Sequence, residues 1–443
     1  MIDASLFLKL ADLIPSHRTI ISEGSTSVVK ALNQHFQEGS ILHFNGGDHG
    51  SLWHIPNEWK LKSAQLIDYN SGEILFSDKN SPLFVAPYSN NVDINLTKEE
   101  LRSITIYSDI NPDALKYQHR LAYNPDQNSK NISVSLPKKF FESLDENRLY
   151  TLSIDVEFRP GTMKIFELVI PGANTESVLL LSHLCHTGQW NDGLAGVLVM
   201  SMVANHLEKA KTNLKYSYRF LSFPETIGSS VYLYENPSLL ESTLFTLFSE
   251  MPGARSEIRI TRSRRRNSYI DRLTSYVLES SGLTHSHVDF REGWGNDEMV
   301  FDSTFAGIPS VSIDRAPFEH YHLSTDTLAN FSMEKLDQIV GIIIKIIELL
   351  EKDYIPKPNF FVTPQLSRLG LYKDWALERK AHDQVNLLLD QLKSEKSVFD
   401  IAASSAIPFE EALKFYDSLA EHNLICKQSI SANYTRNVFD GLS

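Results

Sequence analysis

Apolar side chains recur at helical spacing near the start of the chain. Leu6 and Leu10 begin one apolar face, and similar spacing continues to about residue 37, which predicts helices in this region. A glycine-rich break follows. From about residue 53 to residue 148, short apolar runs alternate with Asn, Asp, Gly and Pro, a pattern typical of short strands and turns. We therefore expect a small, mainly β insertion over residues 46–148.

The pattern changes again from Leu149, where continuous apolar runs alternate with helical segments. Runs without polar alternation are typical of strands that are buried on both faces of a sheet. They predict an α/β fold, in which a mixed, largely parallel sheet is covered by helices. We assign residues 1–45 and 149–355 to this part. The candidate strands are residues 178–181, 220–223, 244–248 and 311–313.

The last part of the chain follows a proline-rich linker at Pro356, Pro358 and Pro364. Three short helices and a final strand at Leu424-Ile425 predict a winged helix-turn-helix-like domain over residues 360–443. Its nine Lys and Arg face eleven Asp and Glu, whereas DNA-binding modules usually carry a basic face. We expect this domain to pack on the rest of the chain or to mediate assembly, and homo-oligomers could form through it or through the β insertion.

Composition narrows the class of protein. The 443 residues carry a net charge of −13, which does not favour nucleic acid or an anionic membrane as a partner. Cys185 and Cys426 are the two cysteines and lie far apart, so no disulfide framework is predicted. The N-terminus lacks a signal-peptide pattern, and the most apolar run, residues 339–350, contains Lys345. We expect a cytoplasmic protein without a membrane span.

Acidic and imidazole side chains follow the candidate strands of the α/β part. Carboxyl ends of neighbouring parallel strands meet at one edge of a sheet, where ligands bind. Imidazole and carboxylate groups are the usual zinc ligands, and a carboxylate beside the metal can take a proton from the water that the metal binds. One histidine at a strand end is commonly only a hydrogen-bonded polar residue, but the ordered set favours a metal site. The set comprises His183, His186, Asp192, Glu225, Glu250 and His322.

Four blocks of the α/β part resemble the co-catalytic zinc aminopeptidases of the M28 clan. They most resemble a branch described as aminopeptidase-like domain proteins, which has a nested β domain and a C-terminal winged helix. Residues 53–59 and 119–124 are similar to its nested domain, and the order of the blocks agrees over nearly the whole chain. The four blocks are Ser182-His183-Leu184-Cys185-His186, Asn191-Asp192-Gly193, Pro224-Glu225-Thr226 and Tyr321-His322-Leu323-Ser324-Thr325-Asp326.

The resemblance implies a role for each of these positions. Glu225 matches the general base. His186 is the first choice for the early imidazole ligand, with His183 as its competitor, while Asp192 and His322 match further ligands. Glu250 matches the acid of a second metal position, although it could simply cap a strand end. Asp326 matches an acid that orients His322, or it is only a helix N-cap.

Two departures from the family pattern weaken a paired-metal site. The usual His-x-Asp reads His183-Leu184-Cys185, and the usual Glu-Glu pair reads Glu225-Thr226. We expect one firmly bound zinc, held by His186, Asp192 and His322, and a second site that is weak or empty. Cys185 could be a thiolate ligand, but a buried structural cysteine is favoured.

An arginine run follows the strand that precedes Glu250. Arg264 and Arg265 belong to this run. The run could be a solvated loop, or its guanidinium groups could bind a substrate carboxylate or phosphate. We favour substrate contact.

Together these features predict a zinc-dependent aminopeptidase-like hydrolase that cleaves an amide bond of a short peptide or a small amide conjugate. Glu225 would assist attack by a metal-bound water. The alternative is a non-catalytic metal-binding scaffold with a degenerate peptidase site, and the two departures motivate it.

Overall fold

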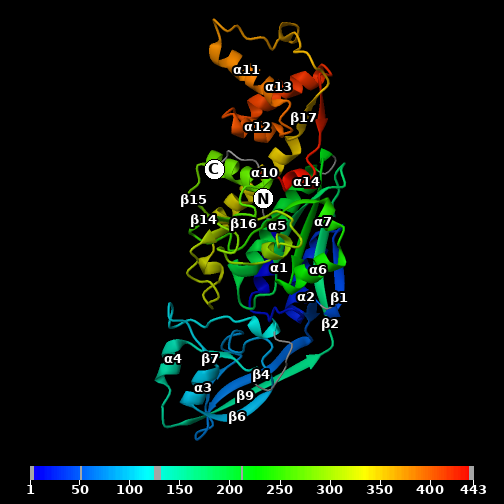
Figure 1. Cartoon of the computed structure of the whole chain (residues 1–443). Coiled ribbons are helices and arrows are strands. Elements are labelled where there is room, and N and C mark those ends of the chain that lie inside the picture. The colour runs from blue at the N-terminus through cyan, green and yellow to red at the C-terminus, as the bar shows by residue number, and fades with distance from the viewer. Residues whose placement is uncertain (1–3, 50–51, 124–130, 211–212, 439–443) are drawn as a thin grey trace.

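The computed structural model describes residues 4–49, 52–123, 131–210 and 213–438. An eight-stranded mixed sheet occupies the middle of the molecule, between the nested region and the C-terminal helices (Figure 1). In spatial order its strands are β1 (Ser40–Asn45), β10 (Thr162–Ile170), β12 (Ser217–Phe223), β11 (Ser177–His183), β13 (Thr243–Phe248), β16 (Ser310–Ala316), β14 (Glu257–Thr261) and β15 (His285–Val288).

The centre of this sheet is parallel. β11 pairs in parallel with β12 on one side and with β13 on the other, and β13 pairs in parallel with β16. β10 and β14 join the outer sides of this group in antiparallel fashion. The four parallel strands therefore present their carboxyl ends at one edge, and the predicted largely parallel, helix-covered sheet is confirmed.

Both faces of the sheet are buried, as the continuous apolar runs require. In β11, Val178 and Leu180 pack into one apolar cluster, while Leu179 and Leu181 pack into the cluster on the opposite face. The first cluster includes side chains of α1 (Ala4–Asp12), α2 (Glu23–His35), α5 (Ala195–Ala210), α8 (Tyr269–Ser281) and α10 (Met333–Lys352). The second includes side chains of α6 (Ile227–Glu235), α7 (Leu239–Ser242) and α9 (Glu298–Phe301).

The apolar run at residues 339–350 lies inside α10, whose apolar side chains face the core. In the described residues, no helix is long and apolar enough to cross a membrane.

The nested region carries its own four-stranded sheet (Figure 1). β9 pairs with β4 and β6 in this sheet, so it packs with the nested region and not with the α/β part, where its position after residue 148 predicted it. Its burial alternates along the strand, which is typical of a half-buried antiparallel strand. The strand order is β5 (Ile74–Ser77), β4 (Glu58–Asp68), β9 (Leu149–Arg159) and β6 (Val92–Thr97).

Short elements complete the nested region. They are β2 (Gly47–His49), β3 (Trp53–Ile55), α3 (Lys98–Ile104), β7 (Thr105–Ile106), η1 (Arg120–Tyr123), β8 (Val134–Ser135) and α4 (Lys138–Ser143).

Three helices of the C-terminal part pack above the main sheet (Figure 1). The segment expected to be a linker contains a strand, β17 (Ile355–Pro358), which pairs with β18 (Ile425–Gln428). Proline is tolerated there because an edge strand needs only some of its N–H groups. The helices are α11 (Arg379–Gln391), α12 (Val398–Ser404) and α13 (Phe409–Glu421), followed by the short α14 (Ala432–Thr435).

Candidate metal centre

The parallel strands deliver the predicted side chains to one place. His183 is the last residue of β11, Glu225 follows β12, and Glu250 follows β13. His322 lies in the segment after β16, and Asp192 lies in the kinked segment that leads into α5. Because β12, β11, β13 and β16 are neighbours, these five side chains share the carboxyl edge of the sheet.

Asp192 lies at the centre of the cluster. Its Oδ1 atom is 3.5 Å from Nε2 of His183 and 3.8 Å from Nε2 of His186. Its Oδ2 atom is 3.0 Å from Nε2 of His322. Oε2 of Glu225 is 3.6 Å from Nε2 of His186. One buried carboxylate therefore faces three imidazoles, and the predicted general base lies beside one of them.

Both candidate early histidines belong to the cluster. Nε2 of His183 lies 2.7 Å from Oε1 of Glu250, and ligand atoms of His183, Asp192 and Glu250 all lie within 4.8 Å of one another. Asn296 donates a hydrogen bond to the other oxygen of Glu250. The geometry therefore does not exclude His183 in favour of His186, because each imidazole approaches Asp192.

Unusual backbone conformations surround these residues. Gly193 has a φ of 123°, a backbone conformation that residues other than glycine rarely adopt. It turns the chain directly after Asp192. Thr226 and His322 have φ values of 59° and 55° although neither is glycine. Such strain persists where the surrounding structure fixes it and is common at functional sites.

Asp326 acts on Asp192 and not on His322. Its Oδ1 accepts hydrogen bonds from the backbone and side-chain amides of Asn191, and its Oδ2 accepts one from the backbone N–H of Asp192 at 3.0 Å. The predicted role in orienting His322 is thus corrected. Asp326 is buried and fixes the kinked segment that carries Asp192.

We expect Asp326→Asn to weaken metal affinity about 10–100-fold, the usual effect of losing a partner that orients a ligand. The amide keeps one acceptor but turns an N–H group toward the backbone N–H of Asp192. Competitive titration with a chelating indicator measures the affinity. Asp337→Asn, a change outside the cluster on α10, is the matched control. Equal affinity in both variants would contradict this role.

Burial controls the protonation of the cluster. It lowers the pKa of His183 to about 4 and that of His186 well below its usual value. Burial also acts to raise the pKa of Asp192, but the imidazoles of His186 and His322 outweigh it and lower that pKa well below the usual range. Neutral imidazoles at His183 and His186 therefore lie beside an ionised Asp192, which are the protonation states that bind a metal.

Glu225 has the opposite tendency. Burial, followed by the charges of Asp297 and Asp192, raises its pKa well above the usual value. A carboxylate with raised proton affinity is suited to accept and hold a proton during a reaction.

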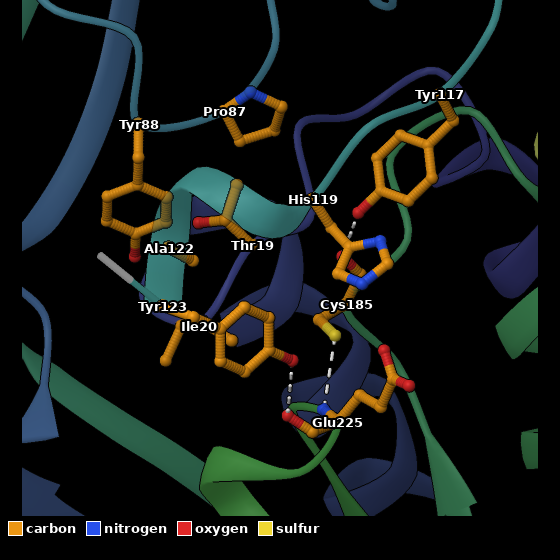
Figure 2. Close-up of a pocket in the computed structure, with 10 residues that line it drawn as sticks. All are labelled: Thr19, Ile20, Pro87, Tyr88, Tyr117, His119, Ala122, Tyr123, Cys185 and Glu225. Carbon is orange, nitrogen blue, oxygen red and sulfur yellow. Dashed lines mark hydrogen bonds between the residues drawn. The ribbon is translucent and has the colours of Figure 1, made fainter. Parts of the chain in front are cut away.

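The surroundings of Glu225 include a small cavity (Figure 2). The backbone N–H of Glu225 donates to Sγ of Cys185, and the hydroxyl of Tyr123 donates to the backbone carbonyl of Glu225. Tyr117 and His119 also line the cavity, whose volume is about 10 Å³, close to what one water molecule needs. Cys185 is buried and accepts this bond, as a structural cysteine would.

Sequence patterns missed some residues that contact the site. Tyr117 and His119 come from the nested region, and their rings lie against His186 and His322. The only signal in the sequence was that His119 is the first residue of a block similar to the nested domain of the family. Asn124, the last residue of that block, lies outside the described residues.

A second missed contact involves Asp297, which accepts hydrogen bonds from the backbone N–H of Thr226 and the hydroxyl of Ser229. It thereby supports the turn that carries Glu225.

The arginines predicted to contact substrate form contacts outside the metal cluster. The backbone N–H of Arg264 donates to Asp302, and the guanidinium of Arg265 donates to the carbonyl of Arg436. Over the described ranges, neither guanidinium forms a hydrogen bond or ion pair with a candidate metal ligand. The contact of Arg265 with Arg436 joins the α/β part to the C-terminal segment, and substrate contact by either arginine stays a prediction.

The donor set fits zinc. It offers neutral imidazole nitrogens and carboxylate oxygens, the ligands that zinc takes in catalytic sites. Within the described part of the chain, Oδ1 of Asp192 and Oε2 of Glu225 are buried without a hydrogen-bond partner. Buried carboxylate oxygens are costly to leave unpaired, and a cation bound by Asp192, with a water that it holds facing Glu225, would reduce that cost.

The fold is that of the zinc aminopeptidases of the M28 type. A zinc aminopeptidase from Bacillus subtilis, BSAP, aligns over 77% of this chain and 93% of its own, with a TM-score of 0.59 and 15% identity. A Clostridium acetobutylicum crystal structure, provisionally named as a peptidase, aligns over 95% of this chain and 96% of its own, with a TM-score of 0.80 and 26% identity.

The chain belongs to the family described as "Domain of unknown function (DUF4910)", whose model matches residues 7–353. A Clostridium acetobutylicum protein is 28% identical over 426 residues, 94% of each chain. Its name, also provisional, is that of a polysaccharide biosynthesis protein with an aminopeptidase-like domain.

Proposed function

We propose that the protein is a zinc-dependent aminopeptidase-like hydrolase that cleaves an amide bond. The observation that carries the proposal is the position of Asp192 between the imidazoles of His183, His186 and His322, with Glu225 alongside. This arrangement supports at least one zinc held by Asp192 with His186 and His322. His183 and Glu250 offer ligands for a second position.

Bound zinc would act as a Lewis acid that polarises the scissile carbonyl and acidifies water. Glu225 accepts the proton of the attacking water at Oε2, the oxygen that faces His186. The raised pKa caused by burial favours this uptake, and the protonated carboxyl then returns the proton to the leaving amine. Asp297 holds the adjacent turn, so the carboxylate keeps its direction during the exchange.

The proposed substrate is a short peptide or a small amide conjugate. The name of the Clostridium relative refers to polysaccharide biosynthesis, so amides of amino sugars belong in the test panel beside aminoacyl amides and dipeptides.

Metal removal tests the proposal. Purified protein should contain roughly stoichiometric zinc, its turnover should be lost after dialysis against a chelator, and added zinc should restore it. Elemental mass spectrometry measures the metal content, and the rate of amine release measures turnover. Metal-free protein with full activity would refute the mechanism. Zinc binding without turnover of any panel member, whatever metal is supplied, would favour the non-catalytic scaffold.

A further inference from the structure

Three imidazoles form a nearly regular triangle at the boundary between the nested region and the α/β part. The ring centroid of His186 lies 5.5 Å from that of His322 and 5.5 Å from that of His119. The centroids of His119 and His322 are 5.4 Å apart. Ligand nitrogens of all three lie within 4.8 Å of one another. Tetrahedral zinc with Zn–N bonds of about 2.0–2.1 Å separates its nitrogens by roughly 3.3 Å, so small side-chain adjustments suffice for all three to reach one ion.

The fold fixes His119 in this place through backbone contacts. The N–H of Tyr117 donates to the carbonyl of His322 at 2.7 Å, and Lys116 pairs with Leu323 in an isolated β-bridge. The N–H of Ser324 donates to the carbonyl of Leu115. The segment that carries His119 is therefore paired along the segment that carries His322, and the two imidazoles are held in register.

Tyr117 strengthens the arrangement from the side. Its ring lies 5.0 Å from that of His186 and 5.2 Å from that of His322, measured between centroids, and its hydroxyl donates to the carbonyl of Cys185. An aromatic wall of this kind excludes water and limits the rotamers of the histidines. The opposite side of the triangle is formed by Asp192, whose Oδ2 faces His322.

We propose that His119, contributed by the nested region, is a metal ligand together with His186 and His322. The inference rests on the metal centre proposed above, but it adds a ligand that the α/β part alone does not contain. A site with three imidazole ligands prefers zinc and related transition metals over magnesium or calcium. The nested region would thus be a structural part of the metal centre.

Removal of the imidazole is the first test. In full-length His119→Ala, the affinity for Zn²⁺ at this position should fall about 100-fold or more, beyond the usual effect of a residue that only orients a ligand. Titration of metal-free protein with Zn²⁺ against a chelating indicator measures it. His54→Ala, which removes an exposed histidine of the same region, is the matched control, and thermal melting of both metal-free variants checks their folding.

A second variant reports direct coordination. In Co²⁺-loaded His119→Cys, a thiolate at this position should produce a sulfur-to-cobalt charge-transfer band that the unmodified protein lacks, because thiolate is itself a good ligand. Unchanged Zn²⁺ affinity in His119→Ala, or no new band in His119→Cys, would overturn the inference. If the unmodified protein binds no metal, the proposed function fails instead.

Discussion

Replacement of Glu225 by glutamine should lower kcat/KM for amide cleavage about 10²–10⁴-fold, the usual contribution of a general base. Glutamine has nearly the same shape but cannot accept the proton that Oε2 of Glu225 is placed to take near His186. Metal content should stay that of the unmodified protein, because Asp192 and the imidazoles remain. Steady-state kinetics on the best substrate of the panel, with elemental analysis of the same sample, measures both quantities.

The matched control for this change is Glu241→Gln, which alters an exposed glutamate of α7. It should leave both kcat/KM and metal content unchanged. A Glu225→Gln protein that keeps its zinc and most of its activity would assign the proton transfer to another group. Loss of zinc in that variant would instead make Glu225 a ligand.

The second large effect concerns stability, where a buried ion pair joins α8 to α12. The guanidinium of Arg272 forms two hydrogen bonds with the carboxylate of Asp400, at 2.7 and 2.9 Å, and both side chains are buried. Arg272→Met should lower the free energy of unfolding by about 3–5 kcal/mol, because it leaves an uncompensated carboxylate in the interior. Denaturant unfolding, together with hydrogen exchange of α12 amides, measures the loss.

A double variant separates the cost of the unpaired charge from the value of the pair. Arg272→Met with Asp400→Leu should recover most of the lost stability, since apolar replacements of buried pairs are often neutral or stabilising. Arg379→Met removes an exposed pair with Asp383 and should have a much smaller effect. If Arg272→Met and Arg379→Met destabilise equally, the buried pair does not attach the C-terminal helices.

The central sheet and the strand-end residues could be predicted because they are local features. The continuous apolar runs end just before the candidate site residues. Glu225 and Glu250 each come two positions after a buried strand. Neighbouring parallel strands then bring them together without further information. The sequence alone does not decide whether His183 or His186 is the metal ligand, because both lie at the end of one strand. In the structure both imidazoles approach Asp192.

Contacts between distant segments could not be predicted in the same way. The guanidinium of Arg265 contacts a carbonyl 171 residues away, and a charge run gives no sign of such a partner. β9 was assigned to the wrong sheet because its pattern shows that it is half-buried but not which strands it pairs with. His119 belongs to a different region from the other imidazoles, and only the backbone pairing of Tyr117 with His322 reveals its place.

The position of His322 after β16, the last of the four parallel strands along the chain, also determines when during biosynthesis the cluster can form. His322 follows β16, so a growing chain that has not yet emerged beyond this strand from the ribosome exposes His183 and Asp192 without their last imidazole partner. Closing the long intervening loops is entropically unfavourable until the sheet core assembles. The cluster around Asp192 can therefore be completed only late in synthesis, after His322 has left the ribosome.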